Sequence, residues 1–83
     1  MQIKIGDWVR VPSRKFDGPY RAAEVIKFEG VHYGCERVLL KIPYYGAIHL
    51  YPVINVEKIT EEQAMLLIRL MAFYHNNIRK LMI

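Results

Sequence analysis

The chain has 83 residues, of which 53% are hydrophobic and 24% are charged, and its formal net charge is +4. This length accommodates one domain, and this composition excludes a disordered or low-complexity chain. The basic excess favours an anionic partner such as nucleic acid without requiring one. The single cysteine excludes an internal disulfide. Neither a signal peptide nor a membrane-spanning segment is recognisable, so the sequence predicts a cytoplasmic protein.

The first two predicted strands lie on either side of a turn-rich loop. Residues 6–13 alternate, with Val9 and Val11 on one face, and a proline stops the strand. Asp-Gly-Pro within residues 14–19 marks a loop. The second strand, residues 20–29, is longer and its alternation is blurred in the middle, which predicts a β-bulge.

The third strand follows a connector at residues 30–34. Residues 37–42 alternate cleanly, and the inward positions are Val38, Leu40 and Ile42. Pro-Tyr-Tyr-Gly then closes a turn to the next strand.

The fourth strand, residues 47–51, ends at a corner made by Pro52, and residues 54–59 supply a short fifth strand. If Ile48 and Leu50 face the core, then the outward positions are Ala47, His49 and Tyr51. This layout predicts a mainly β fold, a small five-stranded SH3-like barrel over residues 1–59, with a C-terminal α-helix over residues 60–83 in the same domain.

The helix start is encoded by a capping box, in which Thr60 and Gln63 satisfy each other's backbone amides. We expect the helix to run from Glu61 to about Met82, a length of about 33 Å, which is more than one end of a small barrel can cover. Its apolar arc is also wider than one packing seam needs. The part of the arc expected to meet a second chain or a partner comprises Leu67, Leu70, Met71, Tyr74 and Ile78. The alternative is a helix that is apolar because it caps the barrel.

Aromatic and basic residues are expected to share the outward faces of the strands. Such a surface suits nucleic acid, because bases stack on rings while Arg and Lys meet phosphates. The predicted binding residues are Trp8, Arg10, Arg14, Lys15, Arg37, Lys41, His49 and Tyr51. The alternative is that the aromatics are half-buried and the charges form a solvated face.

Evidence for a catalytic or metal site is weak. The pair His32-x-x-Cys35 lacks the second close pair of a structural zinc site, so an ordinary loop histidine and a small thiol are expected. The neighbouring acids Glu61 and Glu62 suit a helix N-terminus better than acid–base chemistry. We therefore assign no catalytic residue and no metal.

The stretches "GDWVRV" and "IHLYPVINVEKI" resemble the plasmid-borne type II dihydrofolate reductases, which are SH3-like barrels, over about residues 6–59. The resemblance implies four chains around one central pore, in which His49, Leu50 and Tyr51 would hold NADPH and folate. Two positions depart from the family pattern: Val11 replaces a pore-lining lysine, and His49 replaces a glutamine. Because the lysine would attract an anionic cofactor, we expect a binding surface here and no cofactor.

The leading hypothesis is therefore a non-catalytic binding module for nucleic acid or a protein partner that forms a homo-oligomer through its helix. Two alternatives stay open. One is a type II reductase-like oligomer that uses NADPH, and the other is a structural subunit of a larger assembly.

Overall fold

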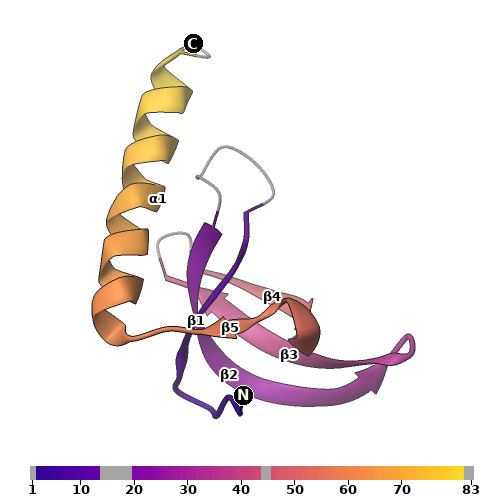
Figure 1. The fold of residues 1–83 in the computed structure, drawn as a ribbon. Helices are drawn as coiled ribbons and strands as arrows, with labels where there is room; N and C mark the ends of the chain where they lie inside the picture. The colour runs from indigo at the N-terminus through magenta and orange to yellow at the C-terminus, as the bar shows by residue number, and fades with distance from the viewer. Residues whose placement is uncertain (1, 14–19, 44–45, 82–83) are drawn as a thin grey trace.

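A computed structural model describes residues 2–13, 20–43 and 46–81, with side chains as far as Asn77. The fold is mainly β, with five antiparallel strands in one sheet and one C-terminal helix (Figure 1). The elements in chain order are β1 (Trp8–Pro12), β2 (Tyr20–His32), β3 (Cys35–Ile42), β4 (Ala47–Pro52), the 3₁₀ turn η1 (Val53–Asn55), β5 (Glu57–Lys58) and α1 (Glu61–Leu81). The strand order is β4-β3-β2-β1-β5, so β4 and β5 are the two edges and the sheet is not closed.

The predicted alternation of β1 and β3 is confirmed. The inward side chains of these two strands are fully buried and form the centre of the core: Val9, Val11, Val38, Leu40 and Ile42. We call this side of the sheet the inner face and the opposite side the outer face. Each apolar side chain of this size contributes about 1.5–3 kcal/mol when it is removed from water.

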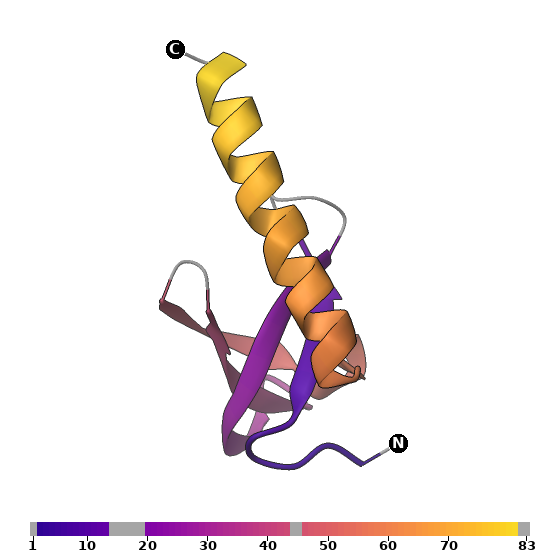
Figure 2. The ribbon, with the colours of Figure 1, turned by 90° about the vertical axis from the view of Figure 1, so that its left-hand side faces the viewer.

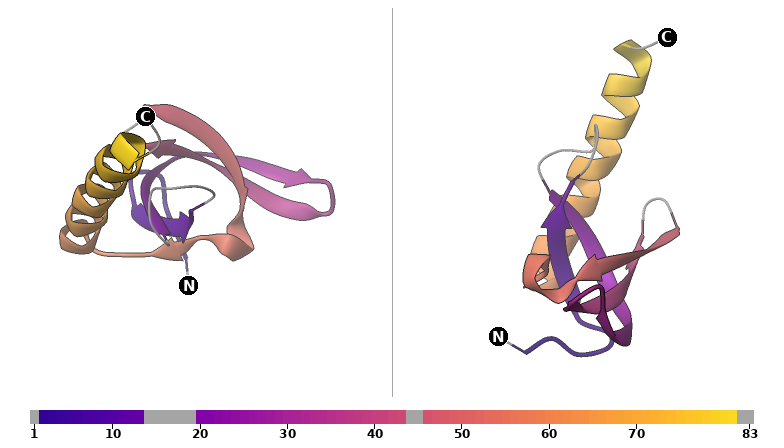
Figure 3. Two further views of the ribbon diagram at one scale, coloured as in Figure 1. Left: turned by 90° about the horizontal axis from the view of Figure 1, so that it is seen from above. Right: turned by 90° about the vertical axis from the view of Figure 1, so that its right-hand side faces the viewer.

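The predicted bulge in the second strand is also confirmed. The register of β2 against β3 shifts between Val25 and Lys27, and it shifts again between Phe28 and Gly30. Each bulge adds an unpaired residue and increases the local twist. The sheet accordingly curls, and the β2–β3 hairpin projects from it (Figure 3).

The predicted connector at residues 30–34 is wrong in its length. Strand β2 continues to His32 and β3 starts at Cys35, so only Tyr33 and Gly34 form the turn. Their φ angles are 55° and 81°, and positive φ at both central residues is the signature of the tight type I′ turn. A turn of this kind needs no additional residues, and the ladder therefore extends to the tip of the hairpin.

The predicted facing of the fourth strand is wrong. Side chains that lie directly opposite in an antiparallel ladder share a face, and the buried inner-face residues Leu40 and Val38 are opposite His49 and Tyr51. The inner face of β4 is thus Ala47, His49 and Tyr51. Ile48 and Leu50 lie on the outer face, where they are 56% and 38% exposed.

The helix begins as predicted and packs on the outer face of β1 and β2, as Figure 2 shows from the helix side. The backbone amide of Gln63 donates to the Thr60 hydroxyl (3.1 Å), and the backbone amide of Thr60 donates to Gln63 Oε1 (2.9 Å). Ala64 and Met71 are fully buried at the contact with the sheet. The fifth strand is only two residues long, because residues 53–55 of the predicted corner and strand form the turn η1.

Candidate functional site

The outer face next to the β4 edge combines cations with exposed aliphatic side chains. Arg37 lies opposite Pro52, Leu39 opposite Leu50, and Lys41 opposite Ile48. Lys41 is exposed and has Glu24 as its neighbour on β2. The surface is therefore mixed in character, with one carboxylate and several apolar groups around the two cations.

Arg10 is engaged by other parts of its own chain. Its guanidinium forms an ion pair with Glu57 (2.7 Å) and lies 4.5 Å from the centroid of the Tyr20 ring. Both partners share the outer face with Arg10, because Glu57 is directly opposite it on β5 and Tyr20 belongs to the next outward pair of the β1–β2 ladder. An exposed pair of this kind contributes at most about 1 kcal/mol. Its effect on binding is to occupy a cation that phosphate would otherwise contact.

Trp8 is half-buried and packs against the hydrophobic core. Its carbonyl accepts a hydrogen bond from the amide of Ile59 at 3.0 Å, which attaches the start of the helix to β1. This placement agrees with the alternative in which the tryptophan is a structural residue.

Arg37 belongs to the β2–β3 hairpin, away from Trp8 and Arg10 in the sheet order. Its Nε donates to the carbonyl of His32 (3.1 Å), and its guanidinium lies 5.8 Å from the centroid of the Tyr33 ring. Tyr33 is 95% exposed at the tip. This pair is the most accessible aromatic–cation contact in the described chain.

His49 and Tyr51 do not join the basic residues, because they lie on the inner face. Their rings meet edge to face with centroids 6.4 Å apart, and Tyr51 is only 3% exposed. The predicted surface is therefore divided among β1, the hairpin and the inside of the sheet. Its two remaining members, Arg14 and Lys15, lie outside the described residues.

The residues that the reductase resemblance selects do not fit NADPH in this chain. Tyr51 is buried, Leu50 lies on the opposite face, and Val11 is fully buried in the core at the position of the family's lysine. The phosphates of the cofactor require accessible cations or donors.

The histidine–cysteine pair of the hairpin makes local contacts. His32 Nε2 lies 2.8 Å from the carbonyl oxygen of Glu29, and the Cys35 thiol lies 3.7 Å from the carbonyl oxygen of His32. Within residues 2–13, 20–43 and 46–81, no group of three or more His, Cys, Asp or Glu side chains is placed to hold a metal ion. No helix of the same residues has the length and apolar character needed to cross a bilayer.

Part of the apolar arc of α1 packs on the sheet, and part of it faces solvent. The face toward the sheet contains Met71, which is fully buried, and the half-buried Leu67 and Tyr74. Leu70 lies on the other face and is 47% exposed. The predicted partner interface is corrected accordingly. Met71 is buried in the core of its own chain and cannot contact a partner, whereas Leu70 is exposed to solvent. The side chain of Ile78 lies outside the described part.

The outward face of α1 has members that the sequence interpretation missed. Leu66 is 58% exposed and Phe73 is 59% exposed, and together with Leu70 they form a row that we call the outward stripe. Their spacing of four and then three residues was visible in the sequence. The predicted interface contained Leu70 and neither Leu66 nor Phe73, so the interpretation did not identify this stripe.

Comparison of the chain with protein-family models, with curated proteins and with solved structures found no match.

Proposed function

We propose that the chain is a non-catalytic protein-binding module with an SH3-like arrangement of strands, and that it self-associates through the outward stripe of α1. The observation that carries this proposal is the exposure of Leu66, Leu70 and Phe73, at 58%, 47% and 59%, on a helix whose other apolar face is already packed on the sheet. Contiguous exposed apolar patches on a protein surface often mark an interaction site.

The spacing of the stripe supports a second copy of the chain as the partner. Leu66, Leu70, Phe73 and Asn77 are separated by four, three and four residues, which is the repeat of a coiled-coil seam. The seam is bordered by Glu62 and other polar side chains, and a narrow seam of this kind suits a single partner helix. The C-terminal half of α1 also extends beyond the sheet, so a second helix can approach it (Figure 1).

Asn77 supports a parallel pairing in register. A single asparagine at such a seam position specifies register and a two-stranded state at some cost in stability. In the single chain its Nδ2 donates to the carbonyl of Phe73 (2.8 Å). The side-chain oxygen of Asn77 would accept a hydrogen bond from the side-chain amide of Asn77 in the second copy.

Sedimentation velocity over a range of concentrations tests this proposal. Leu70→Glu and Phe73→Glu should shift the chain to monomer, because each places a carboxylate in an apolar seam, which costs several kcal/mol. The matched control is Ile54→Glu, the same chemical change at a residue of η1 that is 88% exposed. A wild-type chain that sediments as a monomer at high concentration would overturn the proposal.

The SH3-like assignment is supported by the connectivity of the sheet. The strand order β4-β3-β2-β1-β5 places the first strand between the second and the last. The one-turn helix η1 links β4 to β5. It lies where the sequence predicted a corner before the last strand. A solution or crystal structure that shows β4 paired with β5 would extend this assignment to a closed barrel.

Nucleic acid is the second candidate partner, and the exposed Tyr33 beside Arg37 favours it. A base can stack on Tyr33 while the guanidinium meets a phosphate. In fluorescence anisotropy with single-stranded oligonucleotides at low salt, Tyr33→Ala should weaken binding by about 1–3 kcal/mol without changing the salt dependence. Absence of binding at micromolar protein would remove this candidate.

The reductase alternative is tested by NADPH-dependent reduction of dihydrofolate. We expect no turnover, because Val11 supplies no cation and Tyr51 is buried. Turnover that is lost in His49→Ala would establish the alternative.

A further inference from the structure

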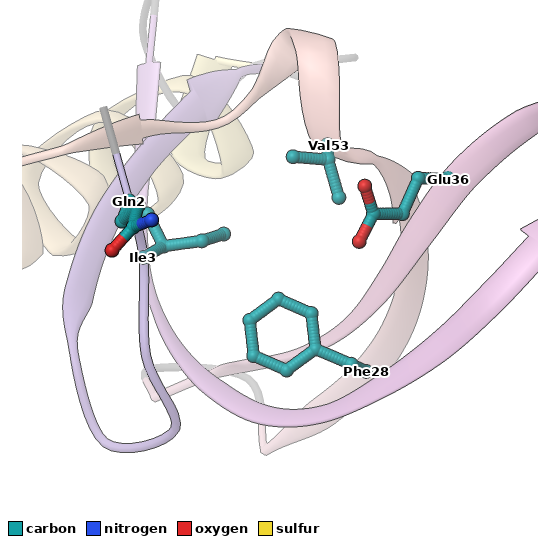
Figure 4. Close-up of a pocket in the computed structure, with 5 residues that line it drawn as sticks. All are labelled: Gln2, Ile3, Phe28, Glu36 and Val53. Atoms are coloured by element: carbon teal, nitrogen blue, oxygen red, sulfur yellow. The ribbon is translucent and has the colours of Figure 1, made fainter.

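A cavity of about 400 Å³ lies between the N-terminal segment, the β2–β3 hairpin and η1 (Figure 4). Its lining is mixed in character and consists of Gln2, Ile3, Phe28, Glu36 and Val53. The volume is within the range of small-ligand pockets, about 300–1,000 Å³. Among the residues that the structure describes with side chains, none of α1 lines the cavity, so the site is separate from the outward stripe.

The strand register places one carboxylate at the end of a buried apolar row. Along β3 the inner-face positions Ile42, Leu40 and Val38 are fully buried, and the next inner-face position is Glu36. The carboxylate of Glu36 points into the same space as the ring of Phe28 (Figure 4). Phe28 is 36% exposed and lies opposite Val38 on β2, so the ring presents its free part to the cavity.

Glu36 differs from several other acids of this chain in having no ion-pair partner among the described residues. Asp7 lies 3.5 Å from Lys58, Glu29 lies 3.4 Å from Lys27, and Glu57 is paired with Arg10. For Glu36, no ion pair or hydrogen bond of the side chain is found within the described residues. Glu36 is exposed, so its carboxylate is accessible at the mouth of the cavity and can accept charge-assisted hydrogen bonds from a cation.

We propose that this cavity binds an alkylammonium group, with the aliphatic stem between Ile3 and Val53, the cation beside the ring of Phe28, and the ammonium donating to the carboxylate of Glu36. Aromatic faces attract ammonium groups, and charge-assisted hydrogen bonds are the stronger class. The group can come from a lysine side chain of a partner protein or from a free diamine.

Titrations of the full-length, isotopically labelled chain followed by ¹H–¹⁵N NMR test the proposal. The probes are Nα-acetyl-lysine methylamide, which represents a peptide lysine, and 1,5-diaminopentane, which represents a free diamine. Saturable shifts at the amides of Phe28, Glu36 and Val53 with either probe support the proposal, and the probe that binds more tightly identifies the source. 1-Pentanol, which lacks the charge, should not saturate.

Matched variants test the contributions of Glu36 and Phe28 to alkylammonium binding. Glu36→Gln keeps the shape of the side chain and should weaken binding about tenfold or more, since a hydrogen bond to a charged group is lost. Phe28→Leu should weaken binding about two- to fivefold, and Glu61→Gln, the same change on the exposed first turn of α1, should have no effect. Retained peak dispersion shows that each variant is folded. Absence of saturable shifts at millimolar probe, equal binding by 1-pentanol, or unchanged affinity in Glu36→Gln would overturn the proposal.

Discussion

Truncation of two adjacent residues of α1 should lower the stability by very different amounts. Met71 is fully buried between the helix and the outer face of the sheet, and its sulfur lies 3.4 Å from the amide nitrogen of Ala22. Met71→Ala removes this packing and should cost about 2–5 kcal/mol. For a chain of 83 residues the whole free energy of unfolding is of the order of 4–12 kcal/mol, so the loss is a large share of it. Leu70 is 47% exposed, and Leu70→Ala should cost less than about 1 kcal/mol.

Urea unfolding followed by fluorescence of the single tryptophan and by circular dichroism measures both changes. With a slope of about 2 kcal/mol per molar urea, the middle of the usual range for small proteins, Met71→Ala should lower the midpoint by roughly 1–2.5 M, and Leu70→Ala should lower it by less than about 0.5 M. The measurement should be made at low protein concentration, because self-association would increase the apparent stability of the wild type. Met71→Leu keeps most of the volume and should cost less than about 1.5 kcal/mol. Equal midpoints for Met71→Ala and Leu70→Ala would refute the assignment of the two helix faces.

Two further predictions concern local structure. Thr60→Ala removes the acceptor for the Gln63 amide and should lower the stability by about 1 kcal/mol, which thermal unfolding detects; an unchanged melting temperature would argue against the capping box. Gly34→Ala places a side chain at φ 81° with open space around it, so the cost is conformational and about 1 kcal/mol, or a fall of about 4–8 °C in melting temperature; an unchanged value would contradict the tight turn of the hairpin.

The parts of the fold that depend on local pattern could be predicted from the sequence. The alternation of Val9 and Val11 identifies one face of β1, because successive side chains of a strand point to opposite sides. The capping box at Thr60 needs only residues within one turn of the helix. In both cases the physical cause lies within a few residues of the effect.

The facing of β4 could not be read from its own residues. Ala47 to Tyr51 present apolar side chains on both faces, so the pattern alone does not select one. The selection comes from the hairpin: Ile42 lies directly opposite Ala47, and the amide of Gly46 donates to the carbonyl of Ile42 at 2.8 Å. A connection one residue longer or shorter would turn every side chain of β4 to the other face.

This reversal explains why the predicted basic–aromatic surface is divided. Tyr51 and Arg37 have opposite facing, because Arg37 is opposite Pro52 and Tyr51 is opposite Val38 in the same ladder. The ring therefore contributes to the core, and the guanidinium lies outside. A composition of cations and aromatics defines a nucleic-acid surface only when the register places them on one side of the sheet.

The division of the helix into two faces depends on tertiary position in the same way. The position of the sheet decides which part of the wide apolar arc is packed. Met71 contacts Ala22 of β2, and Leu70 is exposed to solvent. A small sheet cannot cover all of a helix of 21 residues, so apolar groups are left for another chain. The outward stripe is on the helix, and none of the helix side chains that the structure describes lines the cavity beside Glu36. A change at Leu70 should therefore alter the sedimentation of the chain and leave alkylammonium binding intact. Glu36→Gln should have the converse effect, so the two proposals can fail independently.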